Sequence, residues 1–412
     1  MRTLKQITAR FGHATSGSDQ SAGGHDEKNV SGADLVVFSG AVCADNPELA
    51  AARRLGIPTI ERSEYLAAIA ASFGCVIAIA GSHGKTTATA LTAAATECLN
   101  PTVHIGGEYT GGDGNEYFIT EACEFRRSFL ALAPDVGVIL NADFDHTDCY
   151  GSEEEATAAF VAFGLGCRKL CVCGDDPRLA ALYDHRDSIT FGLGENCDVR
   201  AVGLCADDEN RYSFSLFYLG VNMGRIDLNL VGRHNVYNAL AAATVALGEG
   251  VSMREIARAF AEFKGVKRRA ETLGVVRGAR IIADYAHHPT EIRALIAALG
   301  RRGRLIIVFE PHTYSRTRDL FDRFATCFDG ADEVVFLPVF AAREKTGEVT
   351  SVDLYNEVRK FMPARYFGSY RDAENYLAGE ICEGDTVVFA GAGPIYSAAV
   401  GFVGNYGDKR VE

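Results

Sequence analysis

One stretch of the chain constrains the fold more than any other. Residues 78–95 read AIAGSHGKTTATALTAAA, which begins as an apolar strand, turns at two glycines and continues as an alanine-rich helix. Gly81 and Gly84 let backbone N–H groups approach an anion that a Cβ atom would block, and the N-terminus of the following helix favours negative charge. The stretch therefore predicts a strand, a phosphate-binding loop and a helix, which together form the centre of an α/β domain.

The loop is shorter than the usual phosphate loop, because the standard spacing would need a glycine at the position of Ile79. We expect the Lys85 ammonium to reach terminal phosphates and the Thr86 hydroxyl to bind Mg²⁺. The alternative is a strand–helix turn with a solvated lysine, which the direct junction of a buried strand, Gly-Lys-Thr-Thr and an alanine-rich helix disfavours. The predicted phosphate-binding residues of the loop are Gly81, Ser82, His83, Gly84, Lys85, Thr86 and Thr87.

Strand and helix patterns alternate along most of the chain, which favours an α/β protein with parallel sheets covered by helices. A first small α/β unit ends near Ser72, and a longer unit follows, with a β-rich stretch after residue 197. The basic segment GVKRRAE at residues 265–271 is interpreted as a linker, and strict strand–helix alternation follows it. In open parallel sheets ligands bind beyond the carboxyl ends of the strands, so the loops that follow the strands are the candidate site.

Composition narrows the class of protein. A chain of 412 residues fits two or three domains of ~100–200 residues each, and its net charge of −13 disfavours duplex nucleic acid and anionic membranes as partners. No apolar run approaches the ~20 residues of a membrane span, and the start MRTLKQITARFGH lacks the apolar core of a secretion signal. We expect a cytoplasmic protein whose twelve cysteines are free thiols, without a cysteine-based metal site.

The phosphate loop resembles the ATP loop of the Mur ligases, a family that joins amino acids to bacterial cell-wall precursors. Other segments between roughly residues 34 and 396 are similar to motifs of that family and follow its order, which makes the resemblance specific. These segments are TEACEFRRSFL, NADFDHTD, GRHNVYNALAA, FKGVKRRAE, ADYAHHPTEI, FEPHTYSRT, PVFAAREKTGE and AGAGPIY.

The resemblance implies three domains. Residues 1–72 would form a reduced Rossmann-like domain for the UDP part of the substrate, and residues 73–267 a central P-loop ATPase domain with a mostly parallel sheet. Residues 268–412 would form a Rossmann-like domain that binds the amino acid and closes over ATP. The family's first domain opens with an apolar strand and a glycine-rich loop that this sequence lacks. Either the true start lies upstream, or this is a variant with reduced uridine-nucleotide recognition.

The C-terminal motifs and GVKRR are most similar to family members that add L-alanine to UDP-N-acetylmuramic acid. The resemblance then implies an ATP-dependent ligase of peptidoglycan synthesis that forms an amide bond through an acyl phosphate and releases ADP and phosphate. Its substrates would be small molecules, and the protein a monomer or homodimer. Three alternatives stay open: a ligase that recycles murein peptides, a ligase with another acceptor, and a non-catalytic ATP-binding regulator.

The resemblance also implies the catalytic groups. Mg²⁺ would be held by Thr86, Glu121 and His146. The alternative for His146 is a side chain that caps a turn. Glu124 would either support the ligands or be solvated. Three aspartates nearby are alternative ligands: Asp143, Asp145 and Asp148. Lys85, Glu121, His146 and Arg268 are the expected catalytic residues. The joint presence of Lys85, Thr86, Glu121 and His146 disfavours the regulator. We expect Lys85 to contact phosphate and to pack little, so that its removal leaves the fold intact.

The remaining site residues follow from the same resemblance. His234 with Asn235 or Asn238 would meet the adenine, although one asparagine also suits a helix cap. Arg268, and less so Arg269, would swing from the linker toward the γ-phosphate.

The C-terminal domain would supply the other contacts. Asp284 would meet the ribose of ATP. Tyr285 and His287 would lie near the incoming amino acid, and Arg316 would face its carboxylate. Thr313 stands where the motif often has a second arginine, so the sequence supports amino-acid recognition less strongly than ATP binding.

Overall fold

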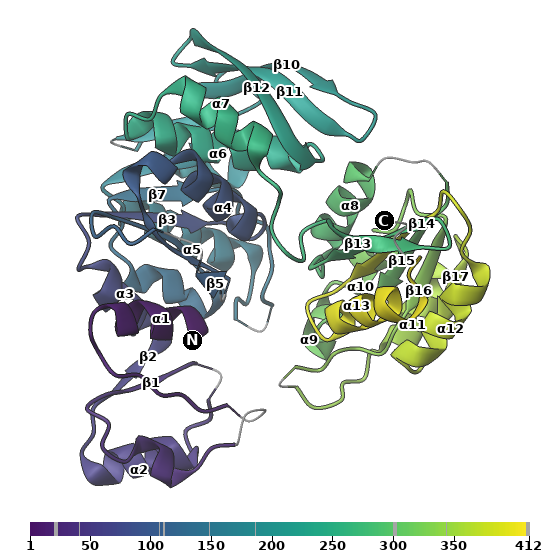
Figure 1. Ribbon diagram of the computed structural model, residues 1–412, viewed down its shortest axis with the longest axis horizontal. Coiled ribbons are helices and arrows are strands. Elements are labelled where there is room, and N and C mark those ends of the chain that lie inside the picture. The colour runs from purple at the N-terminus through teal and green to yellow at the C-terminus, as the bar shows by residue number, and fades with distance from the viewer. Residues whose placement is uncertain are drawn as a thin grey trace.

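The computed structural model describes residues 1–19, 24–40, 42–106, 108–109, 112–147, 149–185, 187–299, 303–342 and 344–408. Within these residues the strands form sheets of two, ten and six strands. Figure 1 shows a small N-terminal unit below the large central sheet, and the C-terminal sheet with its helices beside both. This arrangement confirms the predicted α/β class with mostly parallel sheets.

The N-terminal part is a small α/β unit, as its sequence pattern predicts. Its elements are α1 (Arg2–Arg10), η1 (Glu27–Val30), β1 (Val36–Phe38), α2 (Pro47–Leu55), β2 (Thr59–Glu61) and α3 (Arg62–Ala70). β1 and β2 pair in parallel. α2 begins after Asn46, whose side-chain oxygen accepts from two backbone N–H groups, and ends at Gly56 with a φ of 70°. Proline at the start and a left-handed glycine at the end of a helix are the expected boundary signals.

The central part is built on the ten-stranded sheet. Its helices are α4 (Lys85–Ala95), η2 (Glu97–Leu99), η3 (Phe125–Ala131), α5 (Glu153–Leu165), η4 (Pro177–Leu182), α6 (His234–Gly248) and α7 (Met253–Glu262). Its strands are β3 (Cys75–Ala80), β4 (Thr102–Ile105), β5 (Glu108–Tyr109), β6 (Tyr117–Glu121), β7 (Val136–Ile139), β8 (Lys169–Cys173), β9 (Ser188–Gly192), β10 (Val199–Ala206), β11 (Arg211–Tyr218) and β12 (Val221–Val231).

The order of this sheet is β12-β11-β10-β9-β8-β7-β3-β6-β4-β5. In the order of the sheet, the seven strands β10, β9, β8, β7, β3, β6 and β4 run parallel to one another. β11 and β12 at one edge and β5 at the other are joined by antiparallel pairing. β3 lies in the middle and is buried along its whole length. Ile77 and Ile79 face one core with α4 and α6, and Ala78 faces a second core with α3 and α5, as expected for a strand covered on both faces.

Helix α1 belongs to the second of these cores. Leu4 and Ile7 are buried together with Leu66 of α3 and Phe118 of β6, and the Thr8 and Tyr65 hydroxyl oxygens lie 2.8 Å apart. The N-terminal helix therefore packs under the central sheet, while the chain between α1 and α3 forms the small outer unit (Figure 1). The boundary near residue 72 stays a prediction, because side chains on both sides of it share one core.

The C-terminal part is a six-stranded sheet of order β13-β14-β18-β15-β16-β17, in which only β13 is antiparallel to its neighbour among the described strands. Its strands are β13 (Glu271–Val276), β14 (Ala279–Asp284), β15 (Leu305–Phe309), β16 (Glu333–Phe336), β17 (Ala364–Tyr366) and β18 (Thr386–Ala390). Its helices are α8 (Pro289–Ala298), α9 (Tyr314–Asp319), α10 (Phe321–Ala325), α11 (Ser351–Val358), α12 (Tyr370–Glu380) and α13 (Ile395–Tyr406).

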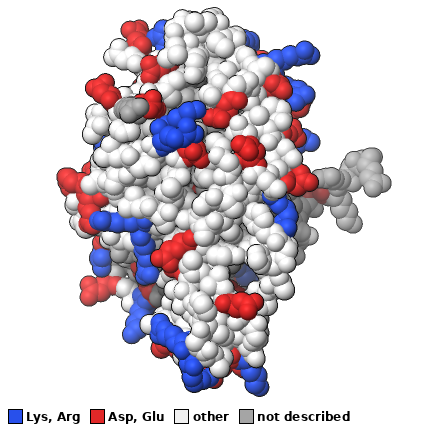
Figure 2. Space-filling model, turned by 90° about the vertical axis from the view of Figure 1, so that its left-hand side faces the viewer, with Lys and Arg blue, Asp and Glu red and all other residues white. Residues whose placement is uncertain are grey.

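Two features of the whole chain bear on its partners. Among the described residues, none of the helices combines the length and apolar character that a membrane crossing requires. On the face shown in Figure 2, Lys and Arg side chains are interspersed with Asp and Glu side chains rather than gathered into one basic field. The twelve cysteines all lie in the described parts of the chain, and none of them forms a disulfide.

Candidate active site

The candidate site lies where β3, β6 and β7 end. β3 pairs in parallel with both of its neighbours, so the loops after the three strands meet at one edge of the sheet. The loop after β3 carries Gly81 to Gly84, β6 ends at Glu121, and the segment after β7 carries residues 140–147. The pattern of apolar strands followed by polar loops therefore predicted the location of this site.

The phosphate loop depends on both of its glycines. Gly81 has a φ of 146° and Gly84 a φ of 87°, in the region that favours glycine. A Cβ atom on Gly84 would lie 2.5 Å from Oδ1 of Asn238, and one on Gly81 would lie 2.9 Å from Cβ of Leu140. The loop is thus held too close to α6 and to the end of β7 for any larger residue.

A side chain from the segment after β7 fixes the loop backbone. The backbone N–H of His83 donates to Oδ1 of Asn141 at 3.0 Å, and Nδ2 of Asn141 donates to the His83 carbonyl at 3.0 Å. The Ser82 hydroxyl donates to the Asp143 carbonyl at 2.6 Å. These bonds preorganise the loop, which lowers the cost of ordering it around an anion.

Lys85 forms a buried charge cluster with Glu124 and His146. The lysine Nζ donates to both carboxylate oxygens of Glu124, at 2.9 and 2.8 Å, and to the Gly81 carbonyl at 2.5 Å. Nε2 of His146 lies 3.2 Å from Oε1 of Glu124. Burial opposes ionisation of Glu124, but Lys85 and His146 lower its pKa below the ordinary value. The cluster therefore holds a carboxylate beside the ammonium of Lys85.

Thr86 and Glu121 form a second group beside the first. Oε1 of Glu121 is buried without a hydrogen-bond partner among the described residues. Burial raises the pKa of Glu121, while a hydrogen bond from Thr86 acts in the opposite direction. The guanidinium of Arg269 reaches the same place, with Nη2 donating to the Thr86 hydroxyl oxygen at 3.5 Å.

These donors fit a magnesium ion, which prefers carboxylate and hydroxyl oxygens. Thr86 and Glu121 lie together as predicted, whereas His146 contacts Glu124 rather than Glu121. Sequence reasoning placed Glu124 outside the ligand set, although Glu124 follows the end of β6 at Glu121 by only three residues. The alternative ligands Asp143 and Asp145 face the C-terminal part of the chain instead, and Asp148 lies outside the described residues.

The residues predicted to contact adenine lie at the start of α6, where Asn238 packs against Gly84 of the phosphate loop. Nδ2 of Asn235 donates to the Val231 carbonyl at 2.8 Å, and Nδ2 of Asn238 donates to Oδ1 of Asn235 at 2.9 Å. Both asparagines are buried, and neither is the N-cap of α6, which is Arg233. Burial lowers the pKa of His234 to about 4, so its imidazole is neutral at physiological pH. Contacts of these side chains with adenine stay a prediction.

The two linker arginines both lie over the ring of Tyr285 but differ in their hydrogen-bond partners. Nη2 of Arg268 donates to the Gly393 carbonyl at 3.1 Å, and its guanidinium lies over the rings of Tyr285 and Tyr396. Arg268 therefore belongs to the C-terminal sheet, and Arg269 is the arginine that points at the phosphate loop. The sequence interpretation favoured Arg268 over Arg269 as the phosphate contact, whereas in the structure Arg269 is the one that reaches Thr86.

Asp284 is engaged with the backbone of the linker. Its carboxylate accepts from the Ala270 and Ala286 N–H groups, each at 2.6 Å, and burial raises its pKa to about 6. Its predicted contact with ribose stays a prediction. Tyr285 and His287 lie together, because Nδ1 of His287 is 2.9 Å from the Tyr285 carbonyl oxygen. Burial lowers the pKa of His287 to about 3.

Arg316 is buried in an ion pair that crosses between the two large parts of the chain. Its Nε and Nη2 atoms both lie 2.9 Å from Oδ1 of Asp145. Burial opposes ionisation of Asp145, but Arg316 holds the pKa of that carboxyl well below its usual range. An amino-acid carboxylate at Arg316 would share the guanidinium with Asp145, so the predicted substrate contact remains to be tested.

The comparisons with known proteins agree with this geometry. Residues 1–74 match the model "Mur ligase family, catalytic domain", residues 79–246 match "Mur ligase middle domain", and residues 268–393 match "Mur ligase, glutamate ligase domain". The UDP-N-acetylmuramate–L-alanine ligase of Alkaliphilus metalliredigens is 38% identical, with 97% of this chain and 94% of the relative covered. The ligase of that name from Clostridium acetobutylicum is 37% identical, with 96% and 93% covered.

A solved structure extends the likeness to three dimensions. The crystal structure of UDP-N-acetylmuramate-alanine ligase from Thermotoga maritima superimposes with a TM-score of 0.79 at 26% identity, over 93% of this chain and 87% of that one. The resemblance noted in the sequence, the three-part α/β fold and the ligase class are thereby confirmed. The chain belongs to the Mur ligase family.

Proposed function

We propose that the chain joins L-alanine to UDP-N-acetylmuramic acid at the expense of ATP. The observation that carries the proposal is the preformed phosphate loop, in which Lys85 is paired with Glu124 and Thr86 faces Arg269 of the linker. The names of relatives that match nearly the whole chain supply the two substrates. Because the reaction consumes ATP, we infer that it occurs in the cytoplasm.

The chemistry requires activation of a carboxylate, whose own leaving group is poor. A carboxylate oxygen of the sugar acid attacks the γ-phosphorus of ATP, the bond to the bridging oxygen breaks, and ADP leaves. The alanine nitrogen then attacks the carbonyl carbon of the acyl phosphate. The tetrahedral intermediate expels phosphate, and the nitrogen loses its proton. The protein contributes mainly positioning and charge stabilisation to such a transfer.

The described residues divide this work between them. The Lys85 ammonium would balance negative charge on the transferring phosphoryl group, and Glu124 orients that ammonium. Arg269 would add positive charge from the opposite side when the C-terminal domain is docked. When bound, Mg²⁺ would neutralise phosphate charge, and Thr86, Glu121 and Glu124 are the residues suited to hold it, with His146 supporting Glu124.

Recognition of the amino acid belongs to the C-terminal domain in this proposal. Tyr285 and His287 lie side by side at the end of β14, and Arg316 lies across from them in its pair with Asp145. We assign the alanine carboxylate to Arg316, and we take monomer or homodimer as the expected assembly.

A phosphate-release assay tests the proposal. The protein is supplied with ATP, Mg²⁺ and UDP-N-acetylmuramic acid, and single amino acids or murein peptides are added in turn. Release that depends on L-alanine is the expected result. Release that depends only on peptide would instead indicate a recycling ligase, and release with neither, above the level of the Lys85→Ala variant, would indicate another acceptor. No release with any addition would refute ligase function.

A further inference from the structure

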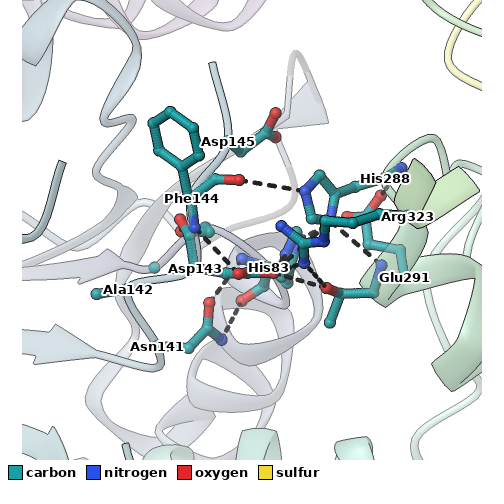
Figure 3. A network of polar contacts seen from close by, with 12 residues as sticks. His83, Asn141, Ala142, Asp143, Phe144, Asp145, His288, Glu291 and Arg323 are labelled. Atoms are coloured by element: carbon teal, nitrogen blue, oxygen red, sulfur yellow. Dashed lines mark hydrogen bonds and ion pairs between the residues drawn. The ribbon is translucent and has the colours of Figure 1, made fainter. Parts of the chain in front are cut away.

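Asp143 lies at the centre of a polar network between the central and C-terminal domains (Figure 3). Its Oδ2 atom accepts from the Thr290 hydroxyl at 2.6 Å and lies 3.5 Å from Nη2 of Arg323. The same oxygen lies 3.0 Å from Nε2 of His83, and Oδ1 accepts from Arg178 at 3.2 Å. One carboxylate therefore joins the phosphate loop, the helix η4 and two helices of the C-terminal domain.

His83 extends this network along the phosphate loop. While Nε2 faces Asp143, Nδ1 of the same ring lies 3.2 Å from Oε1 of Glu291 on α8. The ring also packs against the ring of His288, with centroids 4.7 Å apart. Nε2 makes the hydrogen bond of this ring, and Nδ1 contacts Glu291 at ion-pair distance without a hydrogen bond of its own. His83 thus links the ATP loop directly to the C-terminal domain.

The residues beside Asp143 make two further contacts across the same boundary. Nε2 of His288 donates to the Phe144 carbonyl at 3.3 Å, and Arg316 pairs with Asp145. His288 is fully buried and the Arg316–Asp145 pair is nearly so. Separating the domains would leave buried charged groups without their partners unless water replaced them, so these contacts favour one docked arrangement.

A metal ion is the main alternative occupant of this cluster. Ligand atoms of His83, Asp143 and His288 lie within 4.8 Å of one another. Three of the four ring nitrogens of the two histidines, however, already have a hydrogen-bond partner, and the fourth, Nδ1 of His83, lies 3.2 Å from Oε1 of Glu291. The arrangement therefore matches a network of hydrogen bonds and ion pairs rather than a set of ligands directed at one point.

We propose that Asp143 is a positioning residue, which docks the C-terminal domain through Thr290 and Arg323 and transmits that docking to the ATP loop through His83. We call these four residues with Glu291 the interdomain latch. Its catalytic consequence rests on the proposed function. Docking brings Arg269 to Thr86, so ATP is held from both domains only in the docked form. If only a fraction of the molecules is docked, the apparent affinity for ATP falls by that fraction.

The test uses Thr290, which lies outside the catalytic and substrate residues. Thr290→Val removes the hydroxyl donor and keeps the shape of the side chain, whereas Thr290→Ser keeps the donor. Loss of a hydrogen bond to a charged group predicts a roughly tenfold rise in KM for ATP in Thr290→Val, with a smaller change in kcat. Thr290→Ser should stay near the wild type. In the Asp143→Asn background, Thr290→Val should have little further effect, because its partner is already altered.

A second measurement does not depend on activity. Hydrogen exchange of the peptide covering residues 78–90, without substrates, should be faster in Thr290→Val than in Thr290→Ser or the wild type. Equal exchange and equal KM in the two variants would overturn the latch, even if the ligase activity is established. Faster exchange in a protein without ligase activity would support the latch and refute the proposed function. If Thr290→Val does not fold, Arg323→Gln replaces it, since Nη2 of Arg323 donates to the Thr290 hydroxyl oxygen at 3.0 Å.

Discussion

Lys85 and Glu124 illustrate, at the level of single residues, how this site combines binding and stability. The lysine side chain is only 16% exposed and its partner only 3%. Sequence reasoning treats Lys85 as a side chain that packs little, but in the structure it neutralises a buried carboxylate. A substitution at Lys85 therefore affects more than contacts with phosphate.

Replacement of Lys85 by alanine should abolish turnover and also lower stability. The phosphoryl group loses its cation, which predicts a fall in kcat of at least about a hundredfold, and breaking a buried pair costs about 3 kcal/mol. Phosphate release and thermal unfolding measure the two effects. The double variant Lys85→Ala with Glu124→Gln should regain stability but not activity. A single variant as stable as the wild type would show that Glu124 does not depend on this lysine.

His146 should influence the magnesium requirement through Glu124. Burial alone would lower its pKa, but Asp145 and Glu124 raise it, so His146 helps to keep Glu124 ionised. His146→Ala should shift the Mg²⁺ titration of activity to higher concentration, and Glu121→Gln should shift it as well. Superimposable titrations for His146→Ala and the wild type would remove this histidine from the site.

The two linker arginines should differ in their effects on ATP. Arg269 reaches Thr86 while Arg268 is bound to Gly393 and two tyrosine rings. Arg269→Ala should therefore raise KM for ATP about tenfold or more, whereas Arg268→Ala should mainly lower the melting temperature of the protein. Steady-state kinetics and calorimetry on the two variants distinguish the roles, and the reverse pattern would restore Arg268 as the phosphate contact.

At the level of elements, the strand–loop–helix unit of β3 and α4 sets the geometry of the site. Its glycines lie against Leu140 and Asn238, so the loop conformation is fixed by neighbouring elements as well as by its own sequence. This explains why a loop shorter than the usual phosphate loop still has a defined shape.

Gly84→Ala should disrupt that unit. The positive φ and the approach of 2.5 Å to Oδ1 of Asn238 both oppose a Cβ atom, and left-handed backbone strain alone costs about 1–3 kcal/mol. We expect weaker ATP binding by calorimetry and a lower melting temperature. Gly248→Ala at the end of α6 is the matched control, because a Cβ there meets nothing within 4 Å. Equal melting temperatures for the two variants would argue against a strained loop.

Local patterns in the sequence predicted most elements and the phosphate loop, because strand periodicity and the Gly-Lys-Thr-Thr junction are properties of neighbouring residues. β13 was missed because its start, Glu271, ends the basic linker motif. The role of Glu124 and the commitment of Asp143 and Asp145 to the C-terminal domain were also missed. Their partners lie up to 180 residues away in the chain, and no local pattern records such contacts.

The whole molecule has one chain connection, at residues 263–270, between the central and C-terminal domains. The interdomain latch then controls how often the two domains are docked, because a single connection leaves their angle free. Histidine protonation makes this docking sensitive to pH.

Alkaline pH should loosen the docked form. Burial opposes protonation of His83, but hydrogen bonds to Asp143 and Glu291 raise its pKa to about 9. Asp143 lies in the same domain as His83, so the part of this shift that docking adds comes from Glu291 on α8. Protonated His83 therefore stabilises docking at lower pH, and this contribution is lost as pH rises through about 9. Small-angle scattering between pH 7 and 10 should show an increasing radius of gyration.

The Glu291→Gln variant provides the control for this pH dependence. Removal of one carboxylate should move the expansion toward lower pH, since His83 then loses part of what raises its pKa. Asp322→Asn on α10, an exposed carboxylate, should leave the profile unchanged. A radius of gyration that is constant over this pH range would contradict the assignment of His83.

The hydrogen bond between Thr8 and Tyr65 has a consequence for how such a chain changes over time. It shows that the chain leaves the hydrophobic core of the central part after α1 and returns to that core at α3, close to where it left. The segment between α1 and α3 is accordingly an insertion whose two ends lie close together. Such an insertion can lengthen, shorten or be replaced while the central sheet and its helices keep their structure.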